Sequence, residues 1–220
     1  MKIYPSVLTG SIEEVQKQVD IAKECPDVEV LQFDIIDGFF ADNLTVSPQS
    51  LLEIDFGDLK IDLHLMVEEP MDMMEEIESV RENLPIRAII AQIEKMTYQQ
   101  DFVDDLKSMG FKVGLSLDIY TPVDSLEDGV LEKADILQFM GIEAGFQGQE
   151  LKPVVYKKID EFLKSQNSSS LEVIFDGGVT EKTAEKLVDL GISSFAVGST
   201  LWKAEDFCSQ YRTYLQMGNL

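Results

Sequence analysis

The sequence is poor in basic residues. Its 18 Lys and Arg stand against 41 Asp and Glu, which gives a formal charge of −23 at pH 7. DNA, RNA and anionic lipid surfaces are bound by basic patches, so we expect neither a nucleic-acid nor a membrane partner. A small phosphorylated ligand stays compatible with this charge, because backbone N–H groups at helix N-termini can bind phosphate whatever the net charge.

Long apolar runs and cysteine-rich motifs are also lacking. No run approaches the roughly 18 residues that a membrane span needs, and the first five residues, Met1 to Pro5, lack the apolar core of a signal peptide. We therefore expect a cytoplasmic protein. Cys25 and Cys208 lie far apart and match no metal or redox spacing. Both are expected to be free thiols in a reducing compartment.

What is present is an alternation of apolar and amphipathic segments along the whole chain. Expected strands occupy 3–8, 28–36, 60–66, 87–93, 111–117, 134–139, 171–175 and 194–197. Expected helices occupy 11–25, 47–52, 71–83, 98–109, 121–126, 154–165, 180–190 and 204–215, and Ser168–Ser170 is expected to be a loop. Eight such units without a linker predict an α/β fold, a single-domain (β/α)8 TIM barrel over residues 1–220. An open doubly wound sheet is the alternative, although no Gly-x-Gly-x-x-Gly follows a strand.

Polar residues follow or interrupt the ends of these strands. Asp34 breaks the apolar run 28–36 just before an Asp-Gly turn, and a carboxylate there is costly unless it is paired, bound to a metal or used. In a (β/α)8 barrel the active site lies at the carboxyl ends of the strands. Each residue alone could be a satisfied polar group or a turn former. We expect the following candidates to converge at one mouth: Ser6, Gln32, Asp34, Asp62, His64, Gln92, Glu94, Asp118, Gln138, Met140 and Asp176.

His64 is the only histidine. An isolated histidine on an apolar strand is more often a core residue than a ligand. Its place at a strand end, opposite two carboxylates, favours a functional role. One imidazole and two carboxylates can form a set of ligands for a divalent cation with open positions.

Glycines follow the last two strands, at Gly177-Gly178 and at Gly198, which precedes Ser199. Glycine lets a phosphate approach the backbone, and barrels often bind phosphate in the loops after strands seven and eight. The alternative is that these glycines only close tight turns. The Gly-rich loop 145–149 is expected to be flexible, so it could fold over the same place and exclude water from a reactive intermediate.

Taken in order, these motifs resemble the ribulose-phosphate 3-epimerase family from one end of the chain to the other. No single motif is specific, but the ordered set is. The resemblance implies a metal-dependent barrel enzyme that inverts C3 of a ketopentose phosphate. The motifs are Pro5-Ser6-Val7-Leu8, Asp34 with Asp37-Gly38, Phe40 and Asn43-Leu44-Thr45, Asp62-Leu63-His64-Leu65-Met66-Val67, Thr121-Pro122, Gly145-Phe146 with Gly148-Gln149, Asp176-Gly177-Gly178 and Val197-Gly198-Ser199.

The resemblance also implies residue roles. Asp34 and Asp176 would be the acid–base pair that moves protons on opposite faces of C3, and with His64 they would hold a divalent ion (Zn, Mn, Mg or Fe) that stabilises an enediolate. The substrate, a small phosphorylated sugar, would contact Ser6, His64, Met66, Met140, Gly145, Phe146, Gly148, Gly177, Gly178, Gly198 and Ser199. Barrels of this family often form homo-oligomers, but the sequence fixes no interface.

Several positions depart from the family pattern. The position of a metal-binding His on the second strand holds Gln32, whose amide oxygen can coordinate a hard cation but is a poor ligand for zinc or iron. Gln92 replaces the histidine that usually ends the fourth strand. Ile36 stands where the family has a pocket Met, Glu143-Ala144 where it has Asn-Pro, and Asp42 where it has a Pro.

Three interpretations remain open. The first is an epimerase of ribulose 5-phosphate or a related ketose phosphate with a modified metal site that prefers Mg²⁺ or Mn²⁺. The second is an aldol-type or decarboxylating barrel, but its Asp-x-Lys-x-x-Asp pattern is absent after Asp34. The third is a non-catalytic sugar-phosphate binder that has lost its metal. The presence of Asp34, His64 and Asp176 favours the first.

Overall fold

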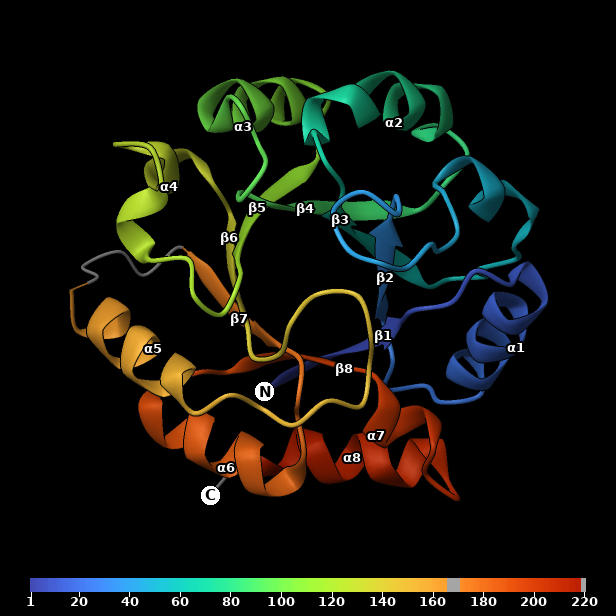
Figure 1. The fold of residues 1–220 in the computed structure, drawn as a ribbon. Helices are drawn as coiled ribbons and strands as arrows, with labels where there is room; N and C mark the ends of the chain where they lie inside the picture. Colours follow the sequence, from blue (N-terminus) through green and yellow to red (C-terminus); the bar gives the residue numbers. More distant parts are fainter. Residues whose placement is uncertain (166–170, 219–220) are drawn as a thin grey trace.

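The strands form a closed barrel. The computed structural model describes residues 1–165 and 171–218, and within them eight parallel strands pair in sequence order, with β8 returning to β1 (Figure 1). This confirms the (β/α)8 barrel and excludes the open sheet. The expected loop Ser168–Ser170 lies outside the described residues. The strands are β1 (Lys2–Val7), β2 (Val30–Ile36), β3 (Lys60–Met66), β4 (Ile86–Gln92), β5 (Lys112–Leu117), β6 (Ile136–Met140), β7 (Glu172–Asp176) and β8 (Ser194–Val197).

Helices follow the strands and surround the barrel. The α-helices are α1 (Ile12–Lys23), α2 (Met74–Val80), α3 (Gln99–Ser108), α4 (Val130–Lys133), α5 (Val154–Ser165), α6 (Glu181–Leu190), α7 (Ser199–Trp202) and α8 (Phe207–Met217). Three 3-10 turns, η1 (Gln49–Glu53), η2 (Pro70–Met73) and η3 (Val123–Ser125), replace the short helices expected at 47–52 and 121–126 and the start of the one expected at 71–83. The sequence did not predict α4 and α7, because four residues are too few to show a helical period.

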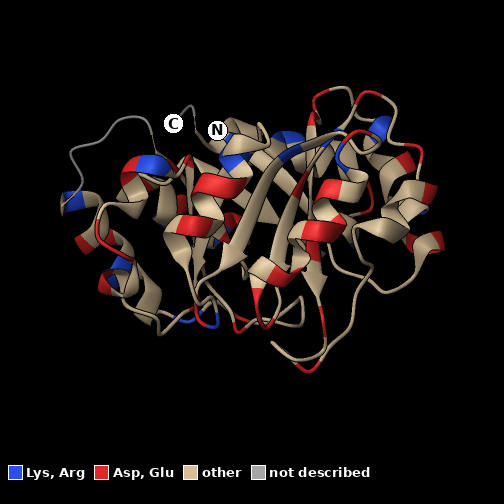
Figure 2. Cartoon of the chain, turned by 90° about the horizontal axis from the view of Figure 1, so that it is seen from above, with Lys and Arg blue, Asp and Glu red and all other residues tan. Residues whose placement is uncertain are grey.

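The core lies between the barrel and its helices. Every residue of β2 is buried, as expected for a parallel strand covered on both faces. Helix α1 shows how a helix docks: Val15, Val19 and Ala22 are fully buried, while acidic residues occupy the outer surfaces of the helices (Figure 2). The barrel interior holds a second, smaller apolar cluster of Tyr4, Val30, Ala88, Ile90, Ile136, Ile174 and Ala196.

Asp62 does not join the mouth of the barrel, so that expectation was wrong. It pairs with Arg87, whose Nε donates to Asp62 Oδ1 at 2.8 Å, and the guanidinium lies over the Tyr4 ring. Asp62 and His64 do share one side of β3, as expected. Two residues span roughly 7 Å along a strand, however. Asp62 precedes His64 by two residues, so it lies that much nearer the amino-terminal end of the barrel.

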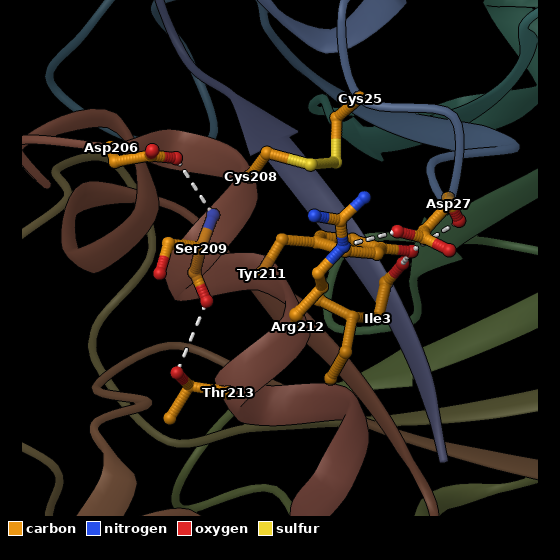
Figure 3. The surroundings of a disulfide bond; sticks show 9 residues. All are labelled: Ile3, Cys25, Asp27, Asp206, Cys208, Ser209, Tyr211, Arg212 and Thr213. Carbon is orange, nitrogen blue, oxygen red and sulfur yellow. Dashed lines mark hydrogen bonds and ion pairs between the residues drawn. A yellow bond between two sulfur atoms is a disulfide. The ribbon is translucent and has the colours of Figure 1, made fainter.

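The two cysteines are not free thiols, so that prediction was wrong. Cys25 and Cys208 form a disulfide that joins the turn after α1 to the first turn of α8 (Figure 3). Arg212 pairs with Asp27 beside it, with 2.7 Å between Arg212 Nε and the Asp27 carboxylate. Barrel closure brings the first and last helices side by side, which cysteine spacing in the sequence cannot reveal. The described residues include no helix long and apolar enough to cross a membrane.

The disulfide closes a loop of 183 residues, so it should stabilise the fold by restricting the unfolded chain. We expect Cys208→Ser to lower the free energy of unfolding by about 4 kcal/mol under oxidising conditions. Urea denaturation with and without a thiol reductant measures this, and the difference from wild type should vanish in the reductant. Two titratable thiols in the unreduced, native protein would contradict the bond.

Candidate active site

Two carboxylates meet at the carboxyl ends of strands that lie on different sides of the barrel. Asp34 is on β2 and Asp176 ends β7, and both are almost fully buried. The Gln32 side chain lies between them: its Nε2 donates to Asp34 Oδ1 at 2.9 Å and to Asp176 Oδ2 at 2.6 Å. Gln138 Nε2 adds a bond of 3.0 Å to Asp176 Oδ2. One amide therefore joins two acids that the sequence separates by 142 positions.

His64 lies directly beside this pair. Its Nδ1 is 3.1 Å from Asp34 Oδ1 and 3.5 Å from Asp176 Oδ2, and the ring is fully buried. Burial disfavours the charged imidazole, but hydrogen bonds to Asp176 and Asp34 and their negative charges outweigh it and raise the pKa of His64 to about 9. Burial likewise raises the pKa of Asp176. Without a cation, a protonated His64 therefore offsets the charge of the two acids.

The Gln92 amide orients the His64 ring. With that amide turned to satisfy its hydrogen bonds, its oxygen accepts from His64 Nε2 at 3.2 Å and from Ser116 Oγ at 3.1 Å. The Nε2 proton is thereby fixed on the side away from the carboxylates, which leaves Nδ1 facing them. A hydrogen bond of this kind sets the tautomer of a metal-binding histidine.

Two hydroxyls hold Asp34 in place. Ser6 Oγ donates to Asp34 Oδ2 at 2.7 Å. Thr45 Oγ1 donates to the Asp34 carbonyl at 2.6 Å and accepts from Ile36 N at 2.8 Å. The sequence placed Ser6 at the site, but Thr45 appeared only inside a motif. Its part in holding β2 depends on the loop folding back, so no local pattern could reveal it.

A cavity of 530 Å³ opens above the two carboxylates. It brings together nearly all the residues expected to touch substrate. His64 and Gln32 do not line it, because they lie buried beneath its floor. Glu94 and Asp118 do not line it either: they meet each other at the rim, where Glu94 accepts from Asp118 N at 2.7 Å. The expected residues on its wall are Ser6, Asp34, Met66, Met140, Gly145, Phe146, Gly148, Asp176, Gly177, Gly178, Gly198 and Ser199.

The cavity also has a basic side that was not expected. Lys182 and Lys186, one turn apart on α6, line it together with Thr183. Thr183 Oγ1 donates to the Gly178 carbonyl at 3.0 Å, and Gly177 and Gly178, both with positive φ, line the same cavity. Two lysines four residues apart directly after a Gly-Gly turn are a visible sequence signal. It is easily passed over in helices with many surface charges.

The model of the "Ribulose-phosphate 3 epimerase family" matches residues 2–202. This chain belongs to that family.

Curated relatives agree with the family assignment. The chain is 28% identical over 211 residues to the chloroplastic ribulose-5-phosphate-3-epimerase of Arabidopsis thaliana, a match that covers 93% of this chain and 73% of the relative. It is 26% identical to the ribulose-phosphate 3-epimerase of Bacillus subtilis, and this match covers 94% of each chain. The similarity therefore extends over the whole barrel.

Solved structures show the same fold at much lower identity. The 3-hexulose-6-phosphate synthase of Salmonella typhimurium superposes with a TM-score of 0.70 at 15% identity, covering 100% of this chain and 99% of the other. The tryptophan synthase α-subunit of Pyrococcus furiosus gives a TM-score of 0.69 at 12% identity, covering 99% and 97%. At such identities the likeness concerns the barrel alone.

The family is metal-dependent, and the residues of this chain can hold a divalent cation. One ligand atom each from Asp34, His64 and Asp176 lie within 4.8 Å of one another. The Gln32 Oε1 atom is buried without a hydrogen-bond partner. Turning this amide over would direct its oxygen at two carboxylate oxygens, an arrangement that a cation between them would stabilise. An oxygen donor there suits Mg²⁺ or Mn²⁺ better than zinc.

The raised pKa of His64 makes the stability of the cation-free protein depend on pH. His64 has a pKa of about 9 in the folded protein and about 6.5 when unfolded. Its contribution is therefore complete below pH 6.5 and disappears as the pH rises through 9. With EDTA present, wild type should lose about 2–3 kcal/mol relative to His64→Gln over this range. Urea denaturation at pH 6 and 9.5 tests this, and parallel losses in the two proteins would contradict it.

Proposed function

We propose that this chain is an epimerase that inverts C3 of D-ribulose 5-phosphate or of a related ketose phosphate. The observation that carries the proposal is the buried pair Asp34 and Asp176, held 2.9 and 2.6 Å from one amide nitrogen beneath a cavity. Inverting a carbon next to a ketone requires removal of a proton from one face and its return to the other. Two acid–base groups from two separate strands, β2 and β7, meet this requirement. The epimerases among the relatives support the assignment.

The surroundings of the two acids suggest how the work is divided. Burial raises the pKa of Asp176, which favours its protonated form as the donor. Asp34 accepts hydrogen bonds from Ser6 and Gln32, which hold its carboxylate oxygens in place, and we assign it the role of the base. In one direction of the reaction Asp34 therefore removes the C3 proton and Asp176 returns one to the other face. In the reverse direction the roles exchange.

The phosphate end of the substrate is assigned to the basic side of the cavity. Gly177, Gly178 and Gly198 give an anion close access to the backbone there, while Ser199 adds a hydroxyl. Lys182 supplies local positive charge on a chain whose net charge is −23. The sugar then extends toward the two carboxylates, with Met66 and Met140 as apolar walls.

A divalent cation held by Asp34, His64 and Asp176, with Gln32 as a fourth donor, would supply positive charge to the developing enediolate. Mg²⁺ or Mn²⁺ suits this oxygen-rich set better than Zn²⁺ or Fe²⁺.

A second function, a non-catalytic sugar-phosphate binder, has one observation in its favour. Gln32 already bridges the two acids without a cation, which would suit a non-catalytic sugar-phosphate binder. A homo-oligomer and a cytoplasmic location remain predictions, and the Cys25–Cys208 disulfide is unusual for the cytoplasm of a mesophile.

Asp176→Asn separates the two functions. Loss of the proton donor should lower kcat for C3 epimerisation of ribulose 5-phosphate by about 10²- to 10⁴-fold, with KM little changed. The assay is run with Mg²⁺, Mn²⁺ and Zn²⁺ added in turn, and C3 proton exchange is followed in D₂O. Wild-type protein without turnover in any metal, yet still binding the sugar phosphate, would establish the binder. Turnover that survives Asp176→Asn would rule out the mechanism.

Gln32→His tests the cation site by binding rather than by activity. Imidazole is a better zinc ligand than an amide oxygen, so the variant should bind Zn²⁺ about tenfold or more tightly than wild type. Its affinity for Mg²⁺ should fall or stay constant. Isothermal titration of the metal-free proteins measures both. Equal zinc affinity in wild type and variant would mean that residue 32 does not reach the ion.

A further inference from the structure

The loop between β6 and α5, residues 141–153, passes over the mouth of the barrel. Figure 1 shows it in yellow, reaching across to β1 and β8. Its shape is fixed internally, because Gln149 Nε2 donates at 2.8 Å to the carbonyls of Glu143 and Phe146. Asn43, which lies at the rim of the barrel, donates from Nδ2 to the Gly145 carbonyl of this loop at 2.6 Å. Phe146 itself is 54% exposed, so its side chain contributes little apolar burial to hold the loop down.

Gln147 is the side chain of this loop that reaches into the site. Its Nε2 donates to the Ser6 carbonyl at 3.1 Å and to Ser6 Oγ at 3.2 Å. Its amide also lies flat against Gly198: a Cβ atom added there would come within 2.4 Å of Gln147 Nε2. Only a glycine at 198 leaves this space. The amide thus fits a slot between the ends of β1 and β8.

The slot connects the loop to the proposed base. Ser6 Oγ, which accepts from Gln147, donates in turn to Asp34 Oδ2 at 2.7 Å. The Ser6 carbonyl that Gln147 reaches also accepts from Trp202 Nε1 at 2.7 Å. Ser6 therefore contacts all three parts: the loop through Gln147, the proposed base Asp34, and Trp202.

We propose that Gln147 is a positioning residue that latches the 141–153 loop closed over the cavity by its bonds to Ser6. Gly145 and Gly148, both at positive φ, flank the latch and give the loop its turning points. If the closed form is the one that binds ligand, the apparent affinity is proportional to the fraction of protein in that form. Two lost hydrogen bonds would reduce that fraction, and so affinity, about tenfold. The effect on substrate rests on the proposed function, whereas the latch itself does not.

The latch can be measured without substrate. Gln147→Ala removes the side chain, while Gln147→Glu keeps its shape and removes the donor. Glu150→Gln, at an exposed position of the same loop, is the matched control. Trp202 is the only tryptophan, so acrylamide quenching of its fluorescence reports on this carbonyl. Chymotrypsin cleavage after Phe146, with cleavage after the exposed Phe39 as internal reference, reports on the loop.

We expect quenching and cleavage after Phe146 to rise at least threefold in Gln147→Ala and Gln147→Glu and to stay at wild-type values in Glu150→Gln. In the epimerase assay, KM should rise about tenfold while kcat changes less than threefold. Unchanged quenching and cleavage in both variants would overturn the latch. A change confined to Gln147→Ala would also overturn it, because packing rather than hydrogen bonding would then hold the loop. An inactive wild type that still shows the substrate-free differences would remove the proposed function and keep the latch.

Discussion

Two carboxylates share one buried position in this barrel, and the residues around them are arranged to make that tolerable. Asp34 and Asp176 both contact Gln32 Nε2 and lie beside the buried His64. Like charges removed from water repel strongly, so such a pair persists only with donors or a cation nearby. Two amide groups supply N–H donors, and an imidazole with a raised pKa supplies positive charge. A divalent cation would replace the imidazole proton and meet the same requirement with greater charge.

The same constraint gives meaning to the departure at residue 32. An amide offers either two N–H donors or an oxygen, so Gln32 can bridge the acids without a cation or coordinate one after turning over. A histidine could bridge the acids less well, because one ring nitrogen carries at most one proton, whereas Gln32 Nε2 donates to both carboxylates. The substitution therefore keeps the two acids in place in either state. It also moves the preferred ion toward oxygen-binding cations.

Above the acids, the cavity depends on segments that are far apart in sequence. Gly198 leaves room for Gln147, and the Ser6 carbonyl receives bonds from both Gln147 and Trp202. Pairing of β1 with β8 closes the barrel and brings the strand ends that carry Ser6 and Gly198 together, where the Gln147 loop reaches them. The Cys25–Cys208 disulfide joins the same two ends of the chain on the outside. The first and last units thus secure the barrel and also complete one wall of the site.

The sequence alone determined the architecture and most of the site. Alternating apolar and amphipathic segments predicted the barrel, and polar residues at the strand ends identified Asp34, His64 and Asp176, because both signals are local and repeat along the chain. Tertiary structure decided what local patterns do not contain. Asp62 lies on the expected side of its strand but toward the other end of the barrel, where it pairs with Arg87 beside an irregularity in the β3–β4 register. Cys25 meets Cys208, and Gln147 reaches Ser6, only because a closed sheet brings its first strand against its last.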